Sequence, residues 1–462
     1  MIGLTLAEVA AAVGGRLCDG AAPQTAVTGT VEYDSRHVTG GGLFVALPGE
    51  RVDGHDFAAA AVEAGAAAVL AGRPVGVPAV VADDPLVALG KLARAVVDRI
   101  DATVVGVTGS SGKTSTKDLI AQLLSELGPT VAPPGTFNNE LGHPYTVLKA
   151  DHDTRFLVLE YSARGLGHID YLCQVAPPRI AVVLNVGVAH LGEFGSVDAI
   201  AKAKGELVEA LPADGVAILN ADDAAVAAMA SRTSARVVRV GQAAGAGVRA
   251  ERVRLDERGR PAYRLVTPAG SADVRLRLSG EHQVGNTLAA AAVALECGMP
   301  VPELARALGE LTLVSERRMD VFDTAGGVTV VDDSYNANPG SMAAALRALT
   351  AIGGPAGRRR WAVLGYMAEL GTAERAGHTE VGQLAARLGV DRLVVVGEPA
   401  APIADGAREE ADWGGDAVQV ADQEAAIAVL RDQLRPGDVV LVKGSRYQTW
   451  KVADALREGA GR

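Results

Sequence analysis

The sequence predicts an α/β protein with three domains, built largely on parallel sheets, and three observations lead to this fold class. Short apolar segments that are typical of buried strands recur along the chain, and helical patterns separate them. A glycine-rich loop joins one of these strands to a helix between residues 103 and 127. The length of 462 residues is enough for two to four domains, each with its own core.

Residues 1–98 are predicted to form a small α/β domain. Its polar loop Tyr33-Asp34-Ser35-Arg36 either binds a ligand or forms a simple turn, and the residues alone do not distinguish the two. We expect strands at 27–31, 42–47, 66–70 and 79–81, helices at 7–13 and 58–64, and a helix at 85–99 that leads into the next domain.

Residues 99–315 are predicted to form a central domain around a parallel sheet. Ligands of such sheets bind beyond the carboxyl ends of the strands, so the residues that follow each strand are the informative ones. Residues 245–280 alternate apolar and charged side chains, which predicts a small antiparallel segment with one solvent-exposed face. A helix is expected to follow at 282–297. The parallel strands are expected at 104–107, 156–160, 180–185 and 215–219.

The loop after the first of these strands is predicted to bind the phosphates of a nucleoside triphosphate. Glycines let backbone N–H groups approach phosphate oxygens, and the helix N-terminus favours the negative charge. Lys113 supplies a positive charge, and Thr114 supplies a hydroxyl to Mg²⁺. Because position 107 is Val, the strict G-x-x-x-x-G-K-[ST] pattern fails, and an ordinary glycine-rich turn is the alternative. The loop comprises Gly109, Ser110, Ser111, Gly112, Lys113, Thr114 and Ser115.

Three further polar side chains of this domain are candidates for the site. Glu160 directly follows a strand, where a carboxylate suits Mg²⁺, although a capping or ion-pairing role is the alternative. His190 lies in the loop after the next strand and is either a ligand, an acid–base group or a solvated histidine. Lys204 lies on a predicted helix, where the pattern alone indicates a surface charge. Asn138 and Asn139 either orient a substrate or close a turn.

Residues 316–462 are predicted to form a second α/β domain. Asp333 to Pro339 is a polar segment after the first strand, and Lys443 to Arg446 follows the last. The strands are expected at 328–331, 361–364, 393–396 and 439–442.

Composition excludes several classes of protein. The net charge of −11 argues against nucleic acid as a partner. The three cysteines are far apart and indicate neither disulfides nor a zinc site. No secretory signal or membrane-spanning segment is recognisable, so we expect a cytoplasmic protein without a membrane partner. A triphosphate site and polar strand ends in three domains suit an ATP-dependent ligase, in which closure protects an activated intermediate from water.

Several motifs in order resemble the Mur ligases of peptidoglycan synthesis, and the resemblance covers almost the whole chain. It is closest to the members that add D-alanyl-D-alanine (D-Ala-D-Ala) to UDP-N-acetylmuramoyl-tripeptide (UDP-MurNAc-tripeptide). The motifs are residues 34–36, 54–56, 109–115, 134–140, 189–196, 203–206 and 333–339. The resemblance implies a UDP-binding N-terminal domain, a central ATPase and a Rossmann-like C-terminal domain that brings the amine. It also implies an acyl-phosphate intermediate, and we expect a monomer.

The resemblance also implies roles for individual residues. Lys113 would hold the transferred phosphate, and Thr114 would bind one Mg²⁺. Glu160 and His190 would bind a second Mg²⁺ together with Lys204, the residue that CO₂ carbamylates in several relatives. Asn138 and Asn139 would orient the substrate near the metals. Ser35 and Arg36 would contact the UDP-linked substrate. The residues in contact with ATP would be Asn286, Arg318, Asp333, Tyr335 and Asn336.

Two tyrosines depart from the family pattern. Tyr161 follows Glu160 where the family usually has Met, and Tyr366 lies where it usually has an acidic residue. A related ligase that joins a different amine or acid is therefore one alternative. A nucleotide-binding protein without ligase activity is another, although such a protein would not need a second metal site.

Overall fold

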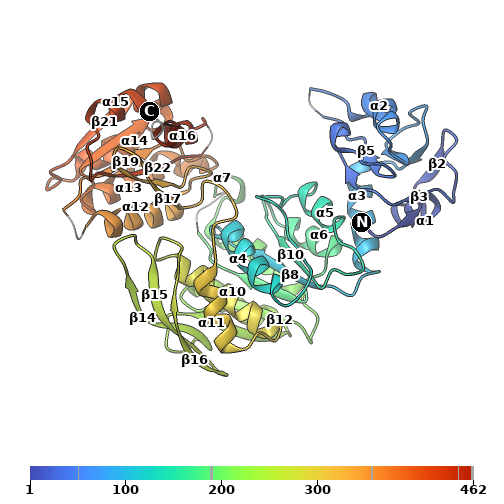
Figure 1. Cartoon of the computed structure of the whole chain (residues 1–462), viewed down its shortest axis with the longest axis horizontal. Helices are drawn as coiled ribbons and strands as arrows, with labels where there is room; N and C mark the ends of the chain where they lie inside the picture. Colours follow the sequence, from blue (N-terminus) through green and yellow to red (C-terminus); the bar gives the residue numbers. More distant parts are fainter. Residues whose placement is uncertain (50, 188–190, 355–356, 446, 459–462) are drawn as a thin grey trace.

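Three β-sheets follow one another along the chain in the computed structural model, which describes residues 1–49, 51–187, 191–354, 357–445 and 447–458. Figure 1 shows the N-terminal and C-terminal units on opposite sides of the central one. This mixed α/β architecture with largely parallel sheets is the predicted fold class. The three sheets lie within 1–98, 99–315 and 316–462, and these boundaries stay predictions.

The N-terminal unit contains a five-stranded sheet in the order β2-β7-β6-β5-β4, in which only β2 is antiparallel to its neighbour. The single strand predicted at 27–31 is wrong, because the chain forms β3 and β4 there in two separate sheets. Between them, the backbone N–H groups of Thr28 and Gly29 donate to Gly41. The elements are β1 (Leu4–Thr5), α1 (Leu6–Val13), β2 (Arg16–Cys18), β3 (Ala26–Val27), β4 (Val31–Glu32), β5 (Leu43–Val45), α2 (Ala58–Glu63), β6 (Ala68–Ala71), β7 (Ala79–Val81) and α3 (Pro85–Val97).

The central sheet has nine strands in the order β16-β15-β14-β13-β12-β11-β8-β10-β9. The sequence did not predict β13 (Arg236–Gly241), since two arginines interrupt its apolar pattern. This strand pairs in parallel with both neighbours and joins the predicted antiparallel segment to the main sheet. The other strands are β8 (Thr103–Thr108), β9 (Thr130–Val131), β10 (Phe156–Glu160), β11 (Ile180–Val183), β12 (Val216–Asn220), β14 (Val248–Leu255), β15 (Pro261–Thr267) and β16 (Gly270–Arg275).

Helices of the central unit connect these strands and cover the sheet. In Figure 1, α4 and α10 lie beside each other over it. The helices are α4 (Lys113–Ser125), α5 (Gly142–Val147), α6 (His168–Val175), α7 (Leu191–Phe194), α8 (Val197–Glu209), α9 (Ala224–Ala228), α10 (Gln283–Glu296) and α11 (Val301–Glu310).

The C-terminal sheet has six strands in the order β17-β18-β22-β19-β20-β21, of which only β17 is antiparallel. The sequence did not predict its edge strands β17 and β21, because both are partly exposed and carry few apolar residues. The elements are β17 (Asp320–Asp323), β18 (Thr329–Asp332), α12 (Pro339–Gly353), β19 (Arg360–Leu364), α13 (Glu374–Arg387), β20 (Arg392–Val396), α14 (Ala401–Glu409), β21 (Asp416–Val420), α15 (Gln423–Gln433), β22 (Val439–Lys443) and α16 (Trp450–Glu458). None of the helices in the described ranges has the length and apolar character needed to cross a bilayer.

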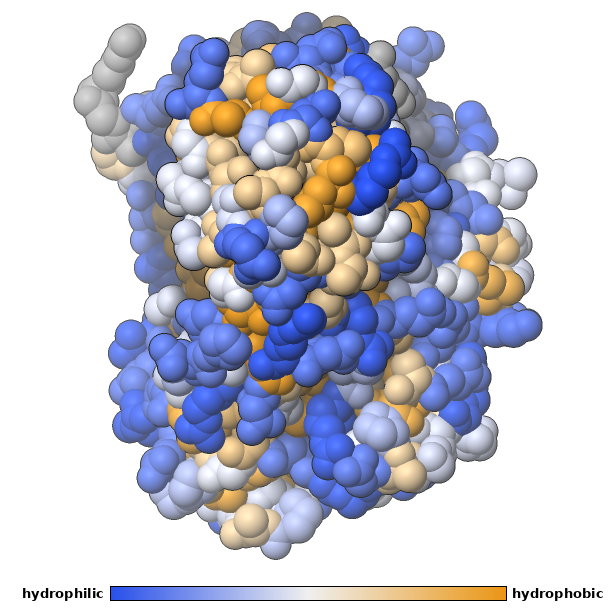
Figure 2. Space-filling view, turned by 90° about the vertical axis from the view of Figure 1, so that its right-hand side faces the viewer, coloured by the Kyte–Doolittle hydropathy of each residue, from blue (hydrophilic) through white to orange (hydrophobic). Residues whose placement is uncertain are grey.

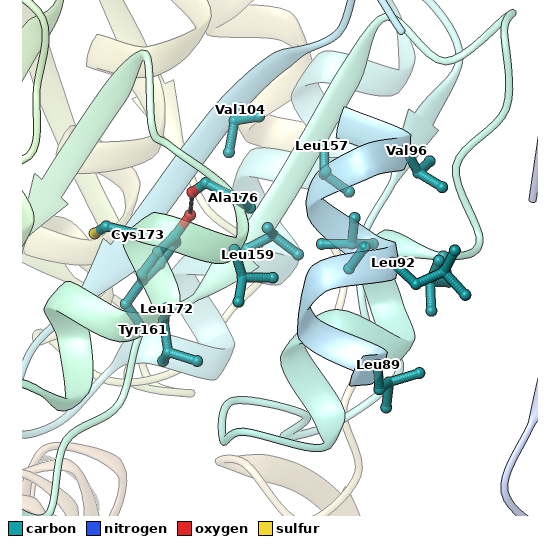
Figure 3. Close-up of a cluster of buried hydrophobic side chains, with 14 of the residues drawn as sticks. Leu89, Leu92, Val96, Val104, Leu157, Leu159, Tyr161, Leu172, Cys173 and Ala176 are labelled. Atoms are coloured by element: carbon teal, nitrogen blue, oxygen red, sulfur yellow. Dashed lines mark hydrogen bonds between the residues drawn. The ribbon is translucent and has the colours of Figure 1, made fainter. Parts of the chain in front are cut away.

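One hydrophobic core joins the N-terminal unit to the central one. Leu89, Leu92 and Val96 of α3 belong to the same buried cluster as Leu157 and Leu159 of β10 (Figure 3). This shared core fixes where the first domain leads into the nucleotide-binding unit.

Tyr161 lies in this core and is fully buried. Its hydroxyl donates a hydrogen bond to the Ala176 carbonyl, and its ring packs edge-on against His143 at 4.6 Å between centroids (Figure 3). The departure from the family pattern at this position therefore changes the packing behind Glu160.

The Tyr161→Phe variant is expected to lower the free energy of unfolding by about 1–2 kcal/mol, because it removes the partner of a buried carbonyl. Urea denaturation measures this loss. Tyr171→Phe is the matched control, since the Tyr171 hydroxyl makes no hydrogen bond within the described ranges. Equal stability of the two variants would contradict the structural role assigned to the Tyr161 hydroxyl.

Candidate active site

The predicted phosphate loop lies at the carboxyl end of β8, directly before α4. Gly112 has a φ of +81°, and a Cβ there would lie 2.8 Å from Asn286 Oδ1, so the turn requires glycine. Lys113 Nζ donates a hydrogen bond to the Gly109 carbonyl at 2.8 Å. Burial lowers the pKa of Lys113, and the neighbouring Glu160 opposes this shift. The loop therefore presents a partly buried cation beside backbone N–H groups.

Glu160 ends β10 beside this loop and is completely buried. Burial raises the pKa of its carboxyl group, whereas Lys113 and Lys117 act to lower it. Its Oε2 accepts a hydrogen bond from Asn138 Nδ2 at 3.3 Å, and its Oε1 has no hydrogen-bond partner among the described residues. A buried carboxylate oxygen without a donor, close to a threonine hydroxyl, is a donor set that fits a hard cation such as Mg²⁺.

Lys204 lies on α8 and is 4% exposed. The surface charge that its helical pattern indicates is therefore wrong. Burial lowers its pKa well below the ordinary lysine range, and the positive charge of Lys113 lowers it further. The fold keeps this amine out of water beside a second cation, which favours a neutral amine or a modified one. His190 lies outside the described residues.

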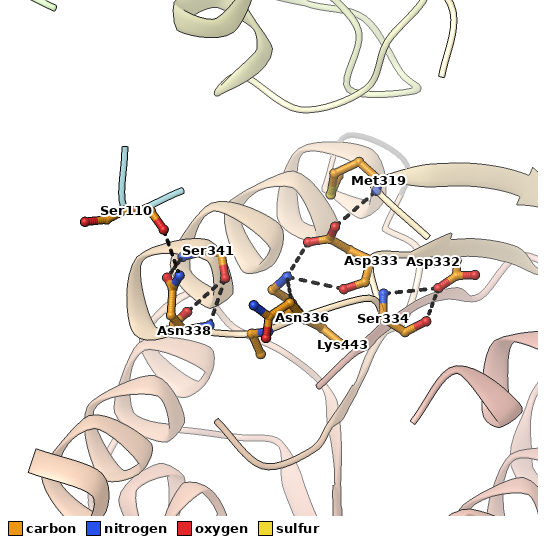
Figure 4. Close-up of polar contacts among 10 residues, drawn as sticks. Ser110, Met319, Asp332, Asp333, Ser334, Asn336, Asn338, Ser341 and Lys443 are labelled. Atoms are coloured by element: carbon orange, nitrogen blue, oxygen red, sulfur yellow. Dashed lines mark hydrogen bonds and ion pairs between the residues drawn. The ribbon is translucent and has the colours of Figure 1, made fainter. Parts of the chain in front are cut away.

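Residues of the C-terminal unit complete the site from the opposite side. Arg318 Nη2 lies 3.4 Å from Thr114 Oγ1, and the guanidinium lies 4.1 Å from the centre of the Tyr335 ring. Its Nε is buried and has no hydrogen-bond partner within the part of the chain that the structure describes. Asn338 Nδ2 lies 3.4 Å from the Ser110 carbonyl (Figure 4). The unit thus directs an arginine donor toward the phosphate loop.

Asp333 and Lys443 form a buried ion pair at the edge of this surface, with 2.5 Å between Oδ2 and Nζ. Lys443 also donates to the carbonyls of Asp333 and Asn336, so it fixes the segment between them (Figure 4). Burial lowers the pKa of Lys443, and Asp333 opposes this shift. Lys443 therefore positions the residues predicted to contact the nucleotide.

A cavity of about 540 Å³ lies between the central and C-terminal units. Gly109 supports the loop through its carbonyl, and Lys204 is buried nearby. Most of the predicted ATP-side and metal-side residues line the cavity: Ser110, Ser111, Gly112, Lys113, Thr114, Ser115, Asn138, Asn139, Glu160, Asn286, Arg318, Asp333, Tyr335 and Asn336.

Ser35 and Arg36 lie in the N-terminal unit, on a short helical turn. The Arg36 side chain is 83% exposed and pairs with Asp34 at 2.6 Å. This unit faces the viewer in the upper part of Figure 2, where a hydrophobic area is bordered by hydrophilic residues.

An aromatic cluster connects that loop to the central unit. Tyr33 packs edge-on against Tyr145 at 5.1 Å, and Tyr145 packs against Phe137 at 5.8 Å. The Tyr145 hydroxyl donates to Glu32 at 2.9 Å. Phe137 directly precedes Asn138, so the cluster links the exposed loop to the cavity.

Sequence reasoning missed several residues that shape the site. Asn185 exchanges two hydrogen bonds with the backbone of Ser111, and its position after a strand was the available signal. Lys117 is fully buried and donates to the carbonyls of Pro133 and Gly135. These contacts hold the segment that leads to Asn138, and no sequence pattern indicated them.

Comparisons with known proteins match most of the chain to one family. Family models match residues 29–103 (Mur ligase family, catalytic domain), 107–294 (Mur ligase middle domain) and 317–446 (Mur ligase, glutamate ligase domain). The chain is 53% identical over 500 residues to the UDP-N-acetylmuramoyl-tripeptide--D-alanyl-D-alanine ligase of Mycobacterium tuberculosis, covering 99% of this chain and 98% of the relative. It is 37% identical to the Escherichia coli protein of the same name, covering 99% of each.

Solved structures agree with these relatives. MurF from Acinetobacter baumannii superposes with a TM-score of 0.89 at 32% identity and covers 99% of each chain. MurF from Thermotoga maritima in complex with ADP superposes with a TM-score of 0.82 at 30% identity, covering 94% of this chain and 98% of the other.

The Lys204→Met variant is expected to raise the free energy of unfolding by about 1–3 kcal/mol, because it removes a buried amine that lies beside the positive charge of Lys113. The lowered pKa means that the unfolded chain binds more protons than the folded one. The destabilisation that the buried Lys204 amine causes in the wild-type protein therefore becomes smaller as the pH rises toward the ordinary pKa range of lysine. Thermal unfolding of the wild type and the variant in CO₂-free buffer at pH 7 and pH 9 measures the gain in stability and its dependence on pH. A variant that is less stable than the wild type would contradict the expectation.

Proposed function

Because the chain belongs to the Mur ligase family, we propose that it uses ATP to join D-Ala-D-Ala to UDP-MurNAc-tripeptide in peptidoglycan precursor synthesis. The observation that carries this function is the similarity to curated ligases with this activity along almost the entire chain. The enzyme is an amide ligase, and it forms a C–N bond between a carboxyl group and an amine.

ATP binds in the cavity between the central and C-terminal units in this proposal. The phosphate loop contacts the phosphates, and Lys113 neutralises the charge that develops on the transferred group. Arg318 reaches the same phosphates from the C-terminal side, which gives its unpartnered Nε an acceptor. Asn286, Asp333, Tyr335 and Asn336 contact the remainder of the nucleotide.

Mg²⁺ would be held by the Thr114 hydroxyl and the Glu160 carboxylate. The unpartnered Glu160 Oε1 supports this assignment, since a bound cation would satisfy it. We further propose that Lys204 carries a carbamate and holds a second Mg²⁺ together with Glu160 and His190. The buried, electropositive position of Lys204 supports this modification, because a neutral amine reacts with CO₂ and the resulting anion pairs with its cationic surroundings. Bound Mg²⁺ supplies charge neutralisation between the phosphates and the carboxylate.

The reaction proceeds in two displacements. A carboxylate oxygen of the tripeptide attacks the γ-phosphorus of ATP, and ADP leaves. The amine of D-Ala-D-Ala then attacks the acyl carbon, loses a proton and expels phosphate together with that oxygen. Asn138 and Asn139 orient the carboxylate, while contacts such as Asn338 to Ser110 close the cavity against water.

The other substrate contacts are assigned to the outer units. Ser35 and Arg36 bind the UDP part, and the C-terminal unit binds D-Ala-D-Ala. Tyr366 lies in that unit, where its hydroxyl donates to Glu374 and its ring stacks on His378 at 5.3 Å. Because Tyr366 lies in the unit proposed to bind the amine, it is the first residue to mutate if the protein accepts a different amine. Monomeric state and a cytoplasmic location stay predictions.

Phosphate release from ATP tests this function. Purified protein is incubated with UDP-MurNAc-tripeptide, D-Ala-D-Ala or both, and we expect stoichiometric release and amide product only with both. Release with the tripeptide and another amine would identify a related ligase instead. ATP binding without release under any combination would favour a nucleotide-binding protein.

The Lys113→Ala variant is expected to lower kcat by about a thousandfold or more, since it removes the cation at the transferred phosphate. Phosphate release measures this loss, and circular dichroism checks that the fold is retained. Lys91→Ala, which removes an exposed lysine on α3, is the control. Turnover within a few-fold of wild type would remove the role assigned to Lys113.

The Lys204→Ala variant is expected to lose most activity and to regain part of it with added formate or acetate. A small carboxylate occupies the space of the missing carbamate and restores the negative charge near the metals. Rates are measured over a range of carboxylate concentrations, with chloride as the ionic control. Full activity without additive would refute the carbamate proposal.

A further inference from the structure

We propose that Arg317 is a positioning residue, which α16 holds so that the adjacent Arg318 reaches the phosphate loop. This inference rests on the proposed function, because it assigns Arg318 to the nucleotide. Arg317 lies in the segment that connects the central unit to the C-terminal one, between α11 and β17. It does not line the cavity that holds Arg318.

The backbone around Arg318 is unusual on both sides. Arg317 has a φ of +60° and Met319 has a φ of +57°. Residues with a Cβ seldom occupy this left-handed region, and they stay there only when their surroundings hold them. The chain therefore makes a strained double turn that has Arg318 at its centre.

Met319 is held from the C-terminal unit. Its side chain is 3% exposed within the core of that unit, and its backbone N–H donates to Asp333 Oδ1 at 3.2 Å. Asp333 is fixed in turn by Lys443 (Figure 4). These contacts fix the second left-handed residue.

Arg317 is held by α16. Its two terminal nitrogens donate to the two carboxylate oxygens of Asp454 at 3.1 and 3.2 Å, a bidentate pair. The guanidinium also lies 5.6 Å from the ring centre of Trp450, one turn earlier on the same helix. The Arg317 carbonyl accepts a hydrogen bond from the Tyr335 backbone at 3.3 Å. The first left-handed residue is thus tied to α16 and to the segment after β18.

Arg318 extends from between these two anchors. Its guanidinium lies on the Tyr335 ring, and its Nη2 lies 3.4 Å from Thr114 and 3.5 Å from Thr136. If the Arg317 anchor is lost, the double turn can relax and Arg318 spends less time in this orientation. The expected consequence is weaker nucleotide binding, while the catalytic groups around Lys113 stay in place.

The chain offers a matched control on the same helix. Arg457 lies three residues after Asp454 and pairs with Asp320 of β17 at 2.6 Å, and its guanidinium lies over Phe322. This pair joins α16 to the neighbouring strand as the Arg317 pair joins α16 to the connecting segment. Among the described residues Arg457 makes no hydrogen bond or ion pair with Arg317 or Arg318. Its partner Asp320 directly follows Met319 but is also held by strand pairing with Asp332 of β18, so Arg457→Gln removes a comparable contact and leaves the Arg317 anchor in place.

The test compares the KM for ATP, kcat, and the ADP dissociation constant from calorimetry. We expect Arg317→Ala and Asp454→Asn each to raise the KM and the ADP dissociation constant about five- to tenfold, with kcat within about threefold of wild type. The double variant should be no worse than either single one, because both remove the same anchor. Arg457→Gln should stay within twofold of wild type.

The Arg317→Gly variant distinguishes the effect of backbone strain on ADP binding from the effect of losing the Arg317 side chain. Glycine adopts a φ of +60° without strain, so this variant should bind ADP more tightly than Arg317→Ala although it too lacks the guanidinium. The proposal would be overturned if the KM for ATP and the ADP dissociation constant of Arg317→Ala and Asp454→Asn were within twofold of those of Arg457→Gln. If the wild type fails to release phosphate, the ligase assignment fails, and the ADP measurements still decide whether Arg317 positions Arg318.

Discussion

Glu160 and Lys204 are buried ionisable groups, and the partly buried Lys113 lies beside them at the edge of one parallel sheet. Burial lowers the pKa of each lysine and raises that of the carboxyl group, because it disfavours the charged form of all three. Such groups destabilise a protein unless a ligand compensates them. In the proposed function, ATP phosphates, Mg²⁺ and a carbamate on Lys204 would supply the compensating charges, so the bound ligands would offset the cost of burying these groups.

The three units are joined around these charged groups in two different ways. The hydrophobic core around α3 and β10 joins the N-terminal unit firmly to the central one, and the aromatic cluster of Tyr33, Tyr145 and Phe137 leads from one to the other. The central and C-terminal units, in contrast, meet through polar contacts around a cavity. A polar interface of this kind can open for substrates and close to exclude water.

Much of the site could be predicted because it depends on local sequence. The phosphate loop and Glu160 follow buried strands, and a parallel sheet brings the carboxyl ends of its strands to one edge. Lys204 could not be found from its helical pattern, since α8 buries it through packing that no spacing reveals. Contacts such as Arg318 to Thr114 join residues far apart in the sequence, so they depend on how the units are arranged. The strand β13 was missed because its arginines hide an otherwise apolar pattern.

The central claim is that the tripeptide carboxylate is activated by phosphorylation at this charged edge. Transfer of ¹⁸O from a labelled terminal carboxylate tests it most directly, because the attacking oxygen leaves with the phosphate. The account predicts one ¹⁸O atom in each inorganic phosphate released during ligation, measured by mass spectrometry. Label in AMP, or unlabelled phosphate together with amide product, would contradict it.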